Sequence, residues 1–361
     1  MTVRPLPIRL LAAHALKALW AAAALLPLLL CAALLAALAR APAAHASEPA
    51  SCREGTSAVP ALMRDGRIAA IEREAAEIAN GEGRLYRAER DGLAPSFLFG
   101  TMHLSDPRIL ALPPAAETAF TGARSLVIET LDVLDPRAMA GALLARPDLT
   151  TLPPGQTIET LLPPAEMARI GPLLAARALP VGAIRTLQPW FVTMSLMVPA
   201  CEAARTADGA KVLDIALAER AAAAGQTVRG LETAVEQTEA LGAMPLALQA
   251  DNLVATAAIV DQLPDVFETM IDLYLKGRIA LIEPATEAMM PAGTEMASSV
   301  EITQRFEETV VRARNGVMAT RLAPLLAQGG VFVAVGALHL PGETGLVEAL
   351  RGAGWRVTRA D

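Results

Sequence analysis

Two stretches of the chain, residues 97–103 and 331–339, share one pattern of hydrophobic and polar positions. Each begins as a continuous hydrophobic run, which is typical of a buried strand. Each run then reaches a glycine, and a histidine, His103 or His339, follows three residues later. A glycine at the exit of a buried strand allows a sharp turn or the close approach of another group. We therefore expect each histidine to lie just beyond a strand end, where its side chain supports little packing.

The rest of the pattern predicts a mixed α/β (α+β) protein with one central sheet that contains both histidine strands. Strands are expected at residues 84–90, 96–104, 125–131, 226–233, 331–335 and 355–359. Helices are expected at residues 59–79, 113–122 and 345–352. A large helical insertion is expected at about 135–225 and 234–328, and it ends with a long helix at residues 300–328. The strand–helix–strand order over residues 96–131 is typical of a βαβ unit. Residues 47–361 are expected to form a single domain.

The first 46 residues have the pattern of a secretory signal. A basic start is followed by an apolar run over residues 18–39 and by the sequence Ala-His-Ala at residues 44–46. This pattern predicts cleavage after Ala46 and a periplasmic or secreted protein. The apolar run is longer than usual for a signal, so an uncleaved N-terminal membrane anchor is the alternative.

The charge of the chain argues against some partners. The formal net charge is −7, and residues 1–46 hold four Lys/Arg and no Asp/Glu, so the remainder carries −11. An acidic chain argues against nucleic acid and anionic membrane surfaces. No apolar run after residue 46 is long enough to cross a bilayer. Stable membrane association is therefore expected only if the signal stays uncleaved.

Two cysteines remain after the predicted signal, Cys52 and Cys201. In an oxidising compartment an even pair suggests one disulfide. The alternative is two unrelated thiols.

Histidine is scarce in this chain. Of the four histidines, His14 and His45 fall within the predicted signal, so His103 and His339 are the two that remain. If their strands are neighbours, the imidazoles meet at the carboxyl edge of the sheet, where ligands bind in open α/β folds. Neutral imidazole is the commonest metal ligand. The alternative is one or two hydrogen-bonded core histidines, but the matched setting favours a shared metal site.

Two glutamates also end predicted strands. Glu129 follows the apolar residues 126–128, and Glu232 ends the strand that begins near residue 226. A carboxylate at a strand end can ligate a metal or act as a general base, or it can cap the helix that follows. Both interpretations stay open for Glu129. Capping is favoured for Glu232, because a helix is expected to begin at Thr233.

Arg314 and Asn315 lie on the predicted helix that precedes the second histidine strand. The apolar side of that helix, which includes Val317, should face the sheet, and Arg314 lies on its flank. A guanidinium near the site would stabilise negative charge that develops during a reaction. The simpler interpretation, which the sequence alone favours, is an exposed arginine paired with Glu307 or Glu308.

Several common catalytic signatures are missing. The sequence has no His-Glu-x-x-His helix, no Walker A loop and no Gly-x-Ser-x-Gly elbow, and the cysteines do not make a zinc cage. The paired Gly-x-x-His stretches are therefore the main chemical signal.

Taken together, these residues resemble the TraB/GumN family, which includes the TIKI proteins. The matching segments keep their order and spacing across nearly the whole chain after residue 46: 99–107, 127–129, 230–233, 314–315 and 335–342. Signal-bearing bacterial GumN-like members are the most similar in character. The resemblance implies a fold similar to that of the EreA/ChaN proteins.

The resemblance also implies a metal-dependent site. His103, His339 and Glu129 would hold a divalent ion, Zn, Mn or Co, and Glu129, Glu232 and Arg314 would be the catalytic candidates. The TIKI branch is described as a metal-dependent peptidase that acts on secreted signalling proteins, so we expect a peptidase-like hydrolase with a peptide or protein substrate. The alternative is a non-catalytic protein that uses the same pocket for a metal, haem or a peptide.

Overall fold

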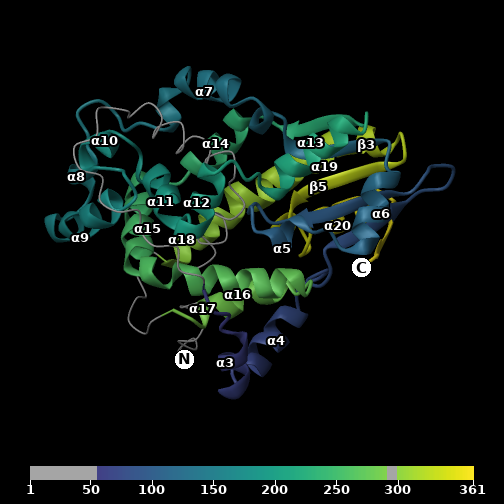
Figure 1. Ribbon diagram of the computed structural model, residues 1–361, viewed down its shortest axis with the longest axis horizontal. Helices are drawn as coiled ribbons and strands as arrows, with labels where there is room; N and C mark the ends of the chain where they lie inside the picture. The colour runs from purple at the N-terminus through teal and green to yellow at the C-terminus, as the bar shows by residue number, and fades with distance from the viewer. Residues whose placement is uncertain (1–54, 291–298) are drawn as a thin grey trace, which may run out of the picture.

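The computed structural model describes residues 55–290 and 299–361, in which helices flank one mixed sheet (Figure 1). The strands are β1 (Leu85–Glu89), β2 (Ser96–Thr101), β3 (Ser125–Thr130), β4 (Thr227–Glu232), β5 (Val331–Gly336) and β6 (Arg356–Arg359). Their order in the sheet is β4-β3-β5-β2-β1-β6. β4, β3, β5 and β2 run parallel, whereas β1 is antiparallel to both of its neighbours. The predicted mixed α/β class is confirmed.

The two histidine strands are neighbours, as their matched patterns predicted. β2 and β5 pair in parallel, with Thr101 opposite Gly336. His103 and His339 therefore leave the sheet at the same edge. β3 pairs in parallel with the other side of β5, so its carboxyl end reaches that edge too.

Helices make up most of the remaining described chain. In chain order the α-helices are α3 (Val59–Arg64), α4 (Ile68–Ala76), α5 (Pro107–Leu110), α6 (Pro114–Gly122), α7 (Pro136–Leu144), α8 (Ile158–Leu161), α9 (Pro164–Ala175), α10 (Val181–Ile184), α11 (Pro189–Met197), α12 (Ala200–Ala207), α13 (Leu213–Ala223), α14 (Ala234–Gly242), α15 (Leu246–Ala258), α16 (Leu263–Leu275), α17 (Ile279–Glu287), α18 (Ser299–Phe306), α19 (Ala313–Leu326) and α20 (Leu346–Gly352). The 3-10 turns are η2 (Asp132–Leu134), η3 (Pro147–Leu149), η4 (Val260–Gln262) and η6 (Ala337–His339), and η5 (Glu307–Arg312) is a π-helix.

Hydrophobic cores fill both faces of the sheet. On one face, Val333 belongs to a core with Met318 of α19 and Leu346 of α20. On the other, Phe332 packs edge-on against Phe120 of α6, with ring centroids 5.5 Å apart, in a core that includes α13. β5 is buried over its whole length for this reason. Such a strand gives a continuous hydrophobic run and no alternation.

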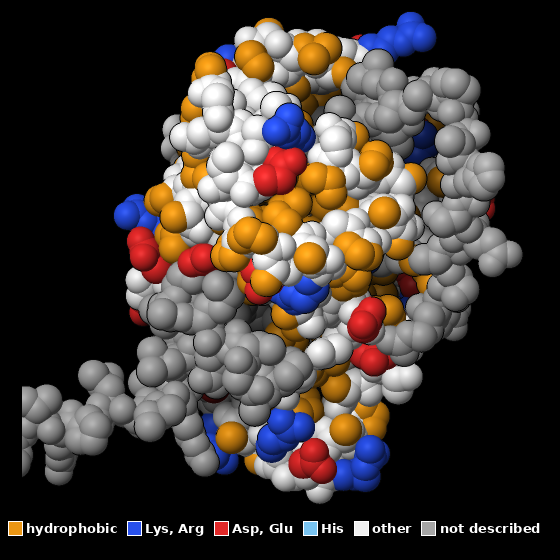
Figure 2. All heavy atoms as spheres, turned by 90° about the vertical axis from the view of Figure 1, so that its left-hand side faces the viewer, with side chains coloured by type: hydrophobic (Ala, Val, Ile, Leu, Met, Phe, Trp, Pro, Cys, Tyr) orange, Lys and Arg blue, Asp and Glu red, His pale blue; other side chains and the backbone are white. Residues whose placement is uncertain are grey.

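Part of the helical insertion gathers at the left of Figure 1, where α8, α9, α11, α15 and α18 lie, whereas α3, α4 and α16 lie at its lower centre. Figure 2 looks onto this side, and hydrophobic side chains gather near its centre with charged side chains around them. Among the described helices, none is long and apolar enough to cross a membrane.

The predicted helix at residues 59–79 forms two helices. Gly66 lies between α3 and α4 and takes a positive φ of 72°, a conformation that interrupts a right-handed helix.

The predicted helix at residues 300–328 changes its winding at η5. From Val310, inside this π-helix, to Leu326 in α19, buried side chains recur at every fourth residue. A wider turn shifts the phase of all positions that follow it. Val317, which was expected to face the sheet, is consequently 39% exposed.

Cys201 in α12 is disulfide-bonded. The predicted partner, Cys52, lies outside the described residues, as does the predicted signal at residues 1–46. A bridge between Cys52 and Cys201 stays a prediction.

Candidate functional site

The three predicted metal ligands converge at the carboxyl edge of the parallel strands. Glu129 lies near the end of β3, and His103 and His339 lie just beyond β2 and β5. The Nε2 atoms of both imidazoles are 3.7 Å from the same carboxylate oxygen, Glu129 Oε1. The histidines are only 4% and 1% exposed, so the expectation that they support little packing was wrong.

Each imidazole is held through its other nitrogen. His103 Nδ1 is 2.5 Å from a carboxylate oxygen of Asp214, and His339 Nδ1 is 2.7 Å from the amide oxygen of Asn315. A carboxylate and an amide oxygen both accept hydrogen bonds, so Nδ1 is the protonated nitrogen in each ring. Nε2 is then the atom that each ring presents to Glu129.

Gly336 leaves the space into which these three side chains reach. A Cβ atom at this position would lie 3.2 Å from Glu129 Oε1 and 3.3 Å from His103 Nε2. The backbone N–H of Gly336 also donates to Glu129 Oε1 at 2.7 Å. The other glycine of the repeat, Gly100, permits a close backbone approach, because a Cβ there would be 2.9 Å from the Cα atom of Ala337. Both glycines are therefore explained by close packing at the strand ends.

A single buried arginine binds two carboxylates. Arg314 Nη2 donates to Glu129 Oε2 and to Glu232 Oε2, each at 2.6 Å, and its Nε donates to Glu232 Oε1 at 3.0 Å. Gln237 in α14 adds a bond from Nε2 to Glu129 Oε2 at 3.1 Å. Bonds between charged groups of this kind are strong and directional. They hold the Glu129 side chain so that its second oxygen faces the histidines.

The burial of Arg314 corrects the simpler interpretation from the sequence. Its side chain is 4% exposed. Arg312, two residues earlier, is the arginine that pairs with Glu307 and Glu308. The phase shift at η5 explains the difference, because it turns position 314 toward the sheet.

Glu232 does not cap the following helix, contrary to expectation. The cap of α14 is Thr233, whose hydroxyl accepts a hydrogen bond from the backbone N–H of Glu236 at 3.2 Å. Glu232 turns instead to the buried Arg314. Both candidate glutamates thus join one cluster.

The two glutamates have pKa values shifted in opposite directions. Burial alone would raise the pKa of Glu129, but Arg314 and the two histidines outweigh it and lower this pKa to about 2. Burial raises the pKa of Glu232, helped by the charge of Glu129 and opposed by Arg314. One guanidinium does not fully compensate two carboxylates. Glu129 therefore stays ionised, and Glu232 is the carboxyl better suited to take up a proton.

The two histidines also differ. Burial lowers the pKa of His339 to about 3, and the nearby Arg314 acts in the same direction. Burial acts against protonation of His103 as well, but the charge and hydrogen bond of Asp214 outweigh it and raise its pKa. His339 is thus neutral at pH 7, as a metal ligand must be.

Asp214 and Gln237 were not predicted from the sequence. Asp214 lies in the first turn of α13 and is 6% exposed. A weak signal existed, because this carboxylate stands between Leu213 and Ile215 at the start of an apolar helix. Gln237 carried no such signal, since a polar residue in the first turn of a helix is ordinarily exposed.

The residues present fit a divalent metal ion, although the described part of the chain contains no group of three or more His, Cys, Asp or Glu side chains already arranged to hold one. Ligands at tetrahedral angles around zinc lie about 3.4 Å apart. The two 3.7 Å separations at Glu129 Oε1 are slightly wider, so a small inward movement of the imidazoles is required. His103 Nε2 is buried and has no hydrogen-bond partner, as expected of an atom that awaits a ligand.

The charges of the cluster also fit a cation. Asp214, Glu129 and Glu232 are each less than a tenth exposed, and the cluster contains one buried guanidinium, that of Arg314. Isolated buried charge is costly unless it is paired or coordinates a metal. A divalent cation would balance the excess of negative charge.

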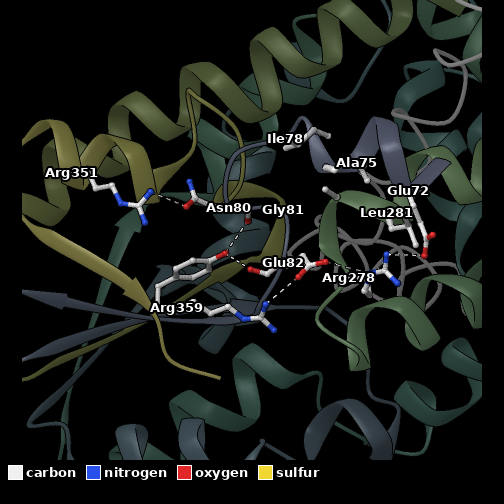
Figure 3. Close-up of a pocket in the computed structure, with 13 residues that line it drawn as sticks. Glu72, Ala75, Ile78, Asn80, Gly81, Glu82, Arg278, Leu281, Arg351 and Arg359 are labelled. Atoms are coloured by element: carbon white, nitrogen blue, oxygen red, sulfur yellow. Dashed lines mark hydrogen bonds and ion pairs between the residues drawn. The ribbon is translucent and has the colours of Figure 1, made fainter. Parts of the chain in front are cut away.

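A separate pocket of about 430 Å³ lies between α4, α17 and the end of β6 (Figure 3). Its polar groups largely satisfy one another. Arg278 pairs with Glu72 at 3.1 Å, Arg351 donates to Asn80 at 2.9 Å, and the Tyr86 hydroxyl donates to the Asn80 carbonyl at 2.8 Å. The pocket contains none of the predicted site residues, so the strand-edge cluster is the better candidate.

Comparison with known proteins agrees with the motifs. The model of the TraB/PrgY/gumN family matches residues 84–359, a range that contains every site residue described above. No match was found among curated proteins or among solved structures.

Proposed function

The chain belongs to the TraB/PrgY/GumN family, and we propose that it is an exported, metal-dependent hydrolase of the peptidase type. The observation that carries this proposal is the convergence of two imidazole Nε2 atoms on one oxygen of Glu129. Three electron-pair donors that face one another in a buried space can be satisfied together by a cation between them.

His103, His339 and Glu129 would hold the ion. Two imidazoles and one carboxylate suit Zn, Mn or Co comparably. A bound divalent ion supplies Lewis-acid chemistry, by which the carbonyl of an amide or ester is polarised. Glu129 lies on β3, and the two histidines lie just beyond β2 and β5, so three adjacent parallel strands bring the three side chains together.

Two neighbouring residues, Glu232 and Arg314, have different roles in this proposal. Glu232 is the proton carrier, because its pKa is raised whereas that of Glu129 is lowered. Arg314 is a positioning residue in this proposal. Its Nε and Nη2 atoms donate to Glu129 and Glu232, and its Nη1 is 3.4 Å from the carbonyl of Val310. It holds both carboxylates in place and does not bind the reacting oxygen.

The substrate class comes from the resemblance to the TIKI branch, and the expected location and charge are compatible with it. The signal pattern of residues 1–46 supports export, and the acidic charge argues against nucleic acid. A peptide or protein outside the cytoplasm is the proposed substrate.

One observation favours a second candidate, a non-catalytic protein that holds a metal, haem or a peptide. His103, His339 and Glu129 are 4%, 1% and 5% exposed, and such burial suits retention of a ligand better than turnover of a large one.

The test is metal content measured beside hydrolysis. Purified protein is loaded with Zn²⁺, Mn²⁺ or Co²⁺, analysed by elemental mass spectrometry, and incubated with a defined peptide mixture that is then read by mass spectrometry. We expect one metal per chain and cleavage, and both should be lost in His103→Ala and His339→Ala. Gln249→Leu is the control, because Gln249 is equally buried and hydrogen-bonded but bonds within the helical part.

Glu129→Gln separates two roles of that residue. Loss of activity with metal retained would assign Glu129 to proton transfer, and loss of both would assign it as a ligand. Bound metal without cleavage of any peptide in the mixture would favour the second candidate. Wild-type protein that binds none of the three metals would refute the proposal.

A further inference from the structure

We infer that Asp214 and Asn315 are the positioning residues of the two histidines, and that Asp214 makes His103 the stronger of two unequal ligands. This inference rests on the proposed function, because it concerns the same site. The two histidines have the same setting in the sequence, with a glycine three residues before each. Their tertiary partners differ in charge, and that difference carries the argument.

The bond from His103 to Asp214 joins two segments that are distant in sequence. Thr101, at the end of β2, donates its hydroxyl hydrogen to the other Asp214 oxygen at 2.8 Å. The backbone N–H of Leu213 donates to the carbonyl of Leu104 at 3.3 Å, which ties the start of α13 to the loop that carries His103. Asp214 is therefore fixed by one strand and one helix, and its oxygens have defined partners.

The bond from His339 to Asn315 is fixed in a similar way. The Asn315 amide nitrogen donates to the carbonyl of Thr344 at 2.9 Å, which turns its oxygen toward His339. Asn315 is 2% exposed and belongs to α19, next to Arg314. Two consecutive residues of α19 thus bind different parts of the site: Arg314 binds the glutamates and Asn315 binds His339.

The chemical consequence is a difference in ligand strength. A carboxylate that accepts the Nδ1–H of an imidazole increases electron density at Nε2 and fixes the tautomer that can ligate. A neutral amide fixes the tautomer with a smaller electronic effect. Loss of such outer partners typically lowers metal affinity by about 10–100-fold.

The experiment compares metal affinity with fold stability. Apparent Kd values for Zn²⁺ alone are measured by competition with a chelator, and Co²⁺ absorption spectra report the ligand field. Asp214→Asn keeps the shape and removes the charge, so it should weaken Zn²⁺ binding by about 10-fold, and Asp214→Leu by up to about 100-fold. Asn315→Leu should weaken binding less than Asp214→Leu does. Melting curves of the metal-free variants test whether the fold is intact.

A second variant keeps the inference testable if the Asp214 variants fail to fold. Thr101→Val leaves Asp214 in place but releases one of its oxygens, so Zn²⁺ binding should weaken and the Co²⁺ spectrum should shift. Unchanged affinity and spectrum in all folded variants, with wild-type protein that binds Zn²⁺, would overturn the inference and leave the proposed function standing. Wild-type protein that binds no Zn²⁺ or Co²⁺ would overturn both.

Discussion

Replacing Arg314 by methionine tests whether this arginine compensates the buried carboxylates. The change keeps an unbranched side chain out to the ε position and removes the guanidinium charge. Removing one partner of a buried ion pair costs about 3–5 kcal/mol, because the other charge is left without compensation. The pKa of Glu129 agrees in direction, because Arg314 is the largest of the influences that lower it, ahead of the two histidines. We therefore expect a loss of about 3–5 kcal/mol in the metal-free protein at neutral pH.

The loss should shrink as the pH falls. The pKa of Glu129 is lower in the folded protein than in the unfolded chain, so its stabilisation is fully present above pH 4.5 and is lost as the pH falls through about 2. Arg314→Met lacks this contribution, and its Glu129 takes up a proton more readily. The free energies of unfolding of the two proteins should therefore converge at acid pH.

Urea unfolding followed by circular dichroism, with chelator-treated proteins at several pH values, measures this convergence. Arg312→Met is the matched control. Arg312 lies two residues earlier and its ion pairs with Glu307 and Glu308 are exposed, so its loss should cost less than about 1 kcal/mol. Equal stability of Arg314→Met and wild type at neutral pH, or a gap that does not change with pH, would refute the reasoning.

Three further predictions concern other parts of the molecule. Gly336→Ala should lower Zn²⁺ affinity by at least about 10-fold, because the added Cβ lies 3.2 Å from Glu129 Oε1; Gly122→Ala, which meets nothing within 4 Å, is the control for the same titration. As the pH falls from about 6.5 toward 3, the metal-free wild type should lose up to about 1.4 kcal/mol of stability per pH unit more than His339→Asn does. The reason is that the imidazole of His339 takes up a proton in the unfolded chain but stays neutral in the fold. Identical pH slopes in urea unfolding would contradict the lowered pKa. N-terminal sequencing of the exported protein should begin near Ser47, whereas an intact Met1 on membrane-bound protein would favour the anchor.

The sheet was predictable because its strands are marked locally. β2, β3 and β5 are short hydrophobic runs bounded by turn residues, and the matched glycines made β2 and β5 candidates for neighbours. His103, His339 and Glu129 were expected at one edge of the sheet, because the carboxyl ends of parallel strands coincide. Strand-end residues thus follow from pattern alone, without any knowledge of the helices.

The helices were less predictable, and the site residues that they supply were missed or misjudged. A regular period of 3.6 residues places Val317 inside and Arg314 on a flank, but the π-helix η5 shifts the phase and reverses both. The local sequence pattern did not predict this change of winding. Asp214 was hidden for a different reason: its role depends on a contact with His103, which lies 111 residues away in the chain.

The repeat and its surroundings therefore determine different properties of the site. The two Gly-x-x-His stretches determine where the imidazoles lie, because each glycine admits a close neighbour at the end of its strand. The helices α13 and α19 determine how each imidazole behaves, because one supplies a carboxylate and the other an amide. Positions that are alike in sequence thus acquire different surroundings, with the pKa of one histidine raised and that of the other lowered. The duplicated motif thus sets the place of the proposed metal site, and under that proposal segments outside the motif set the strength of each ligand.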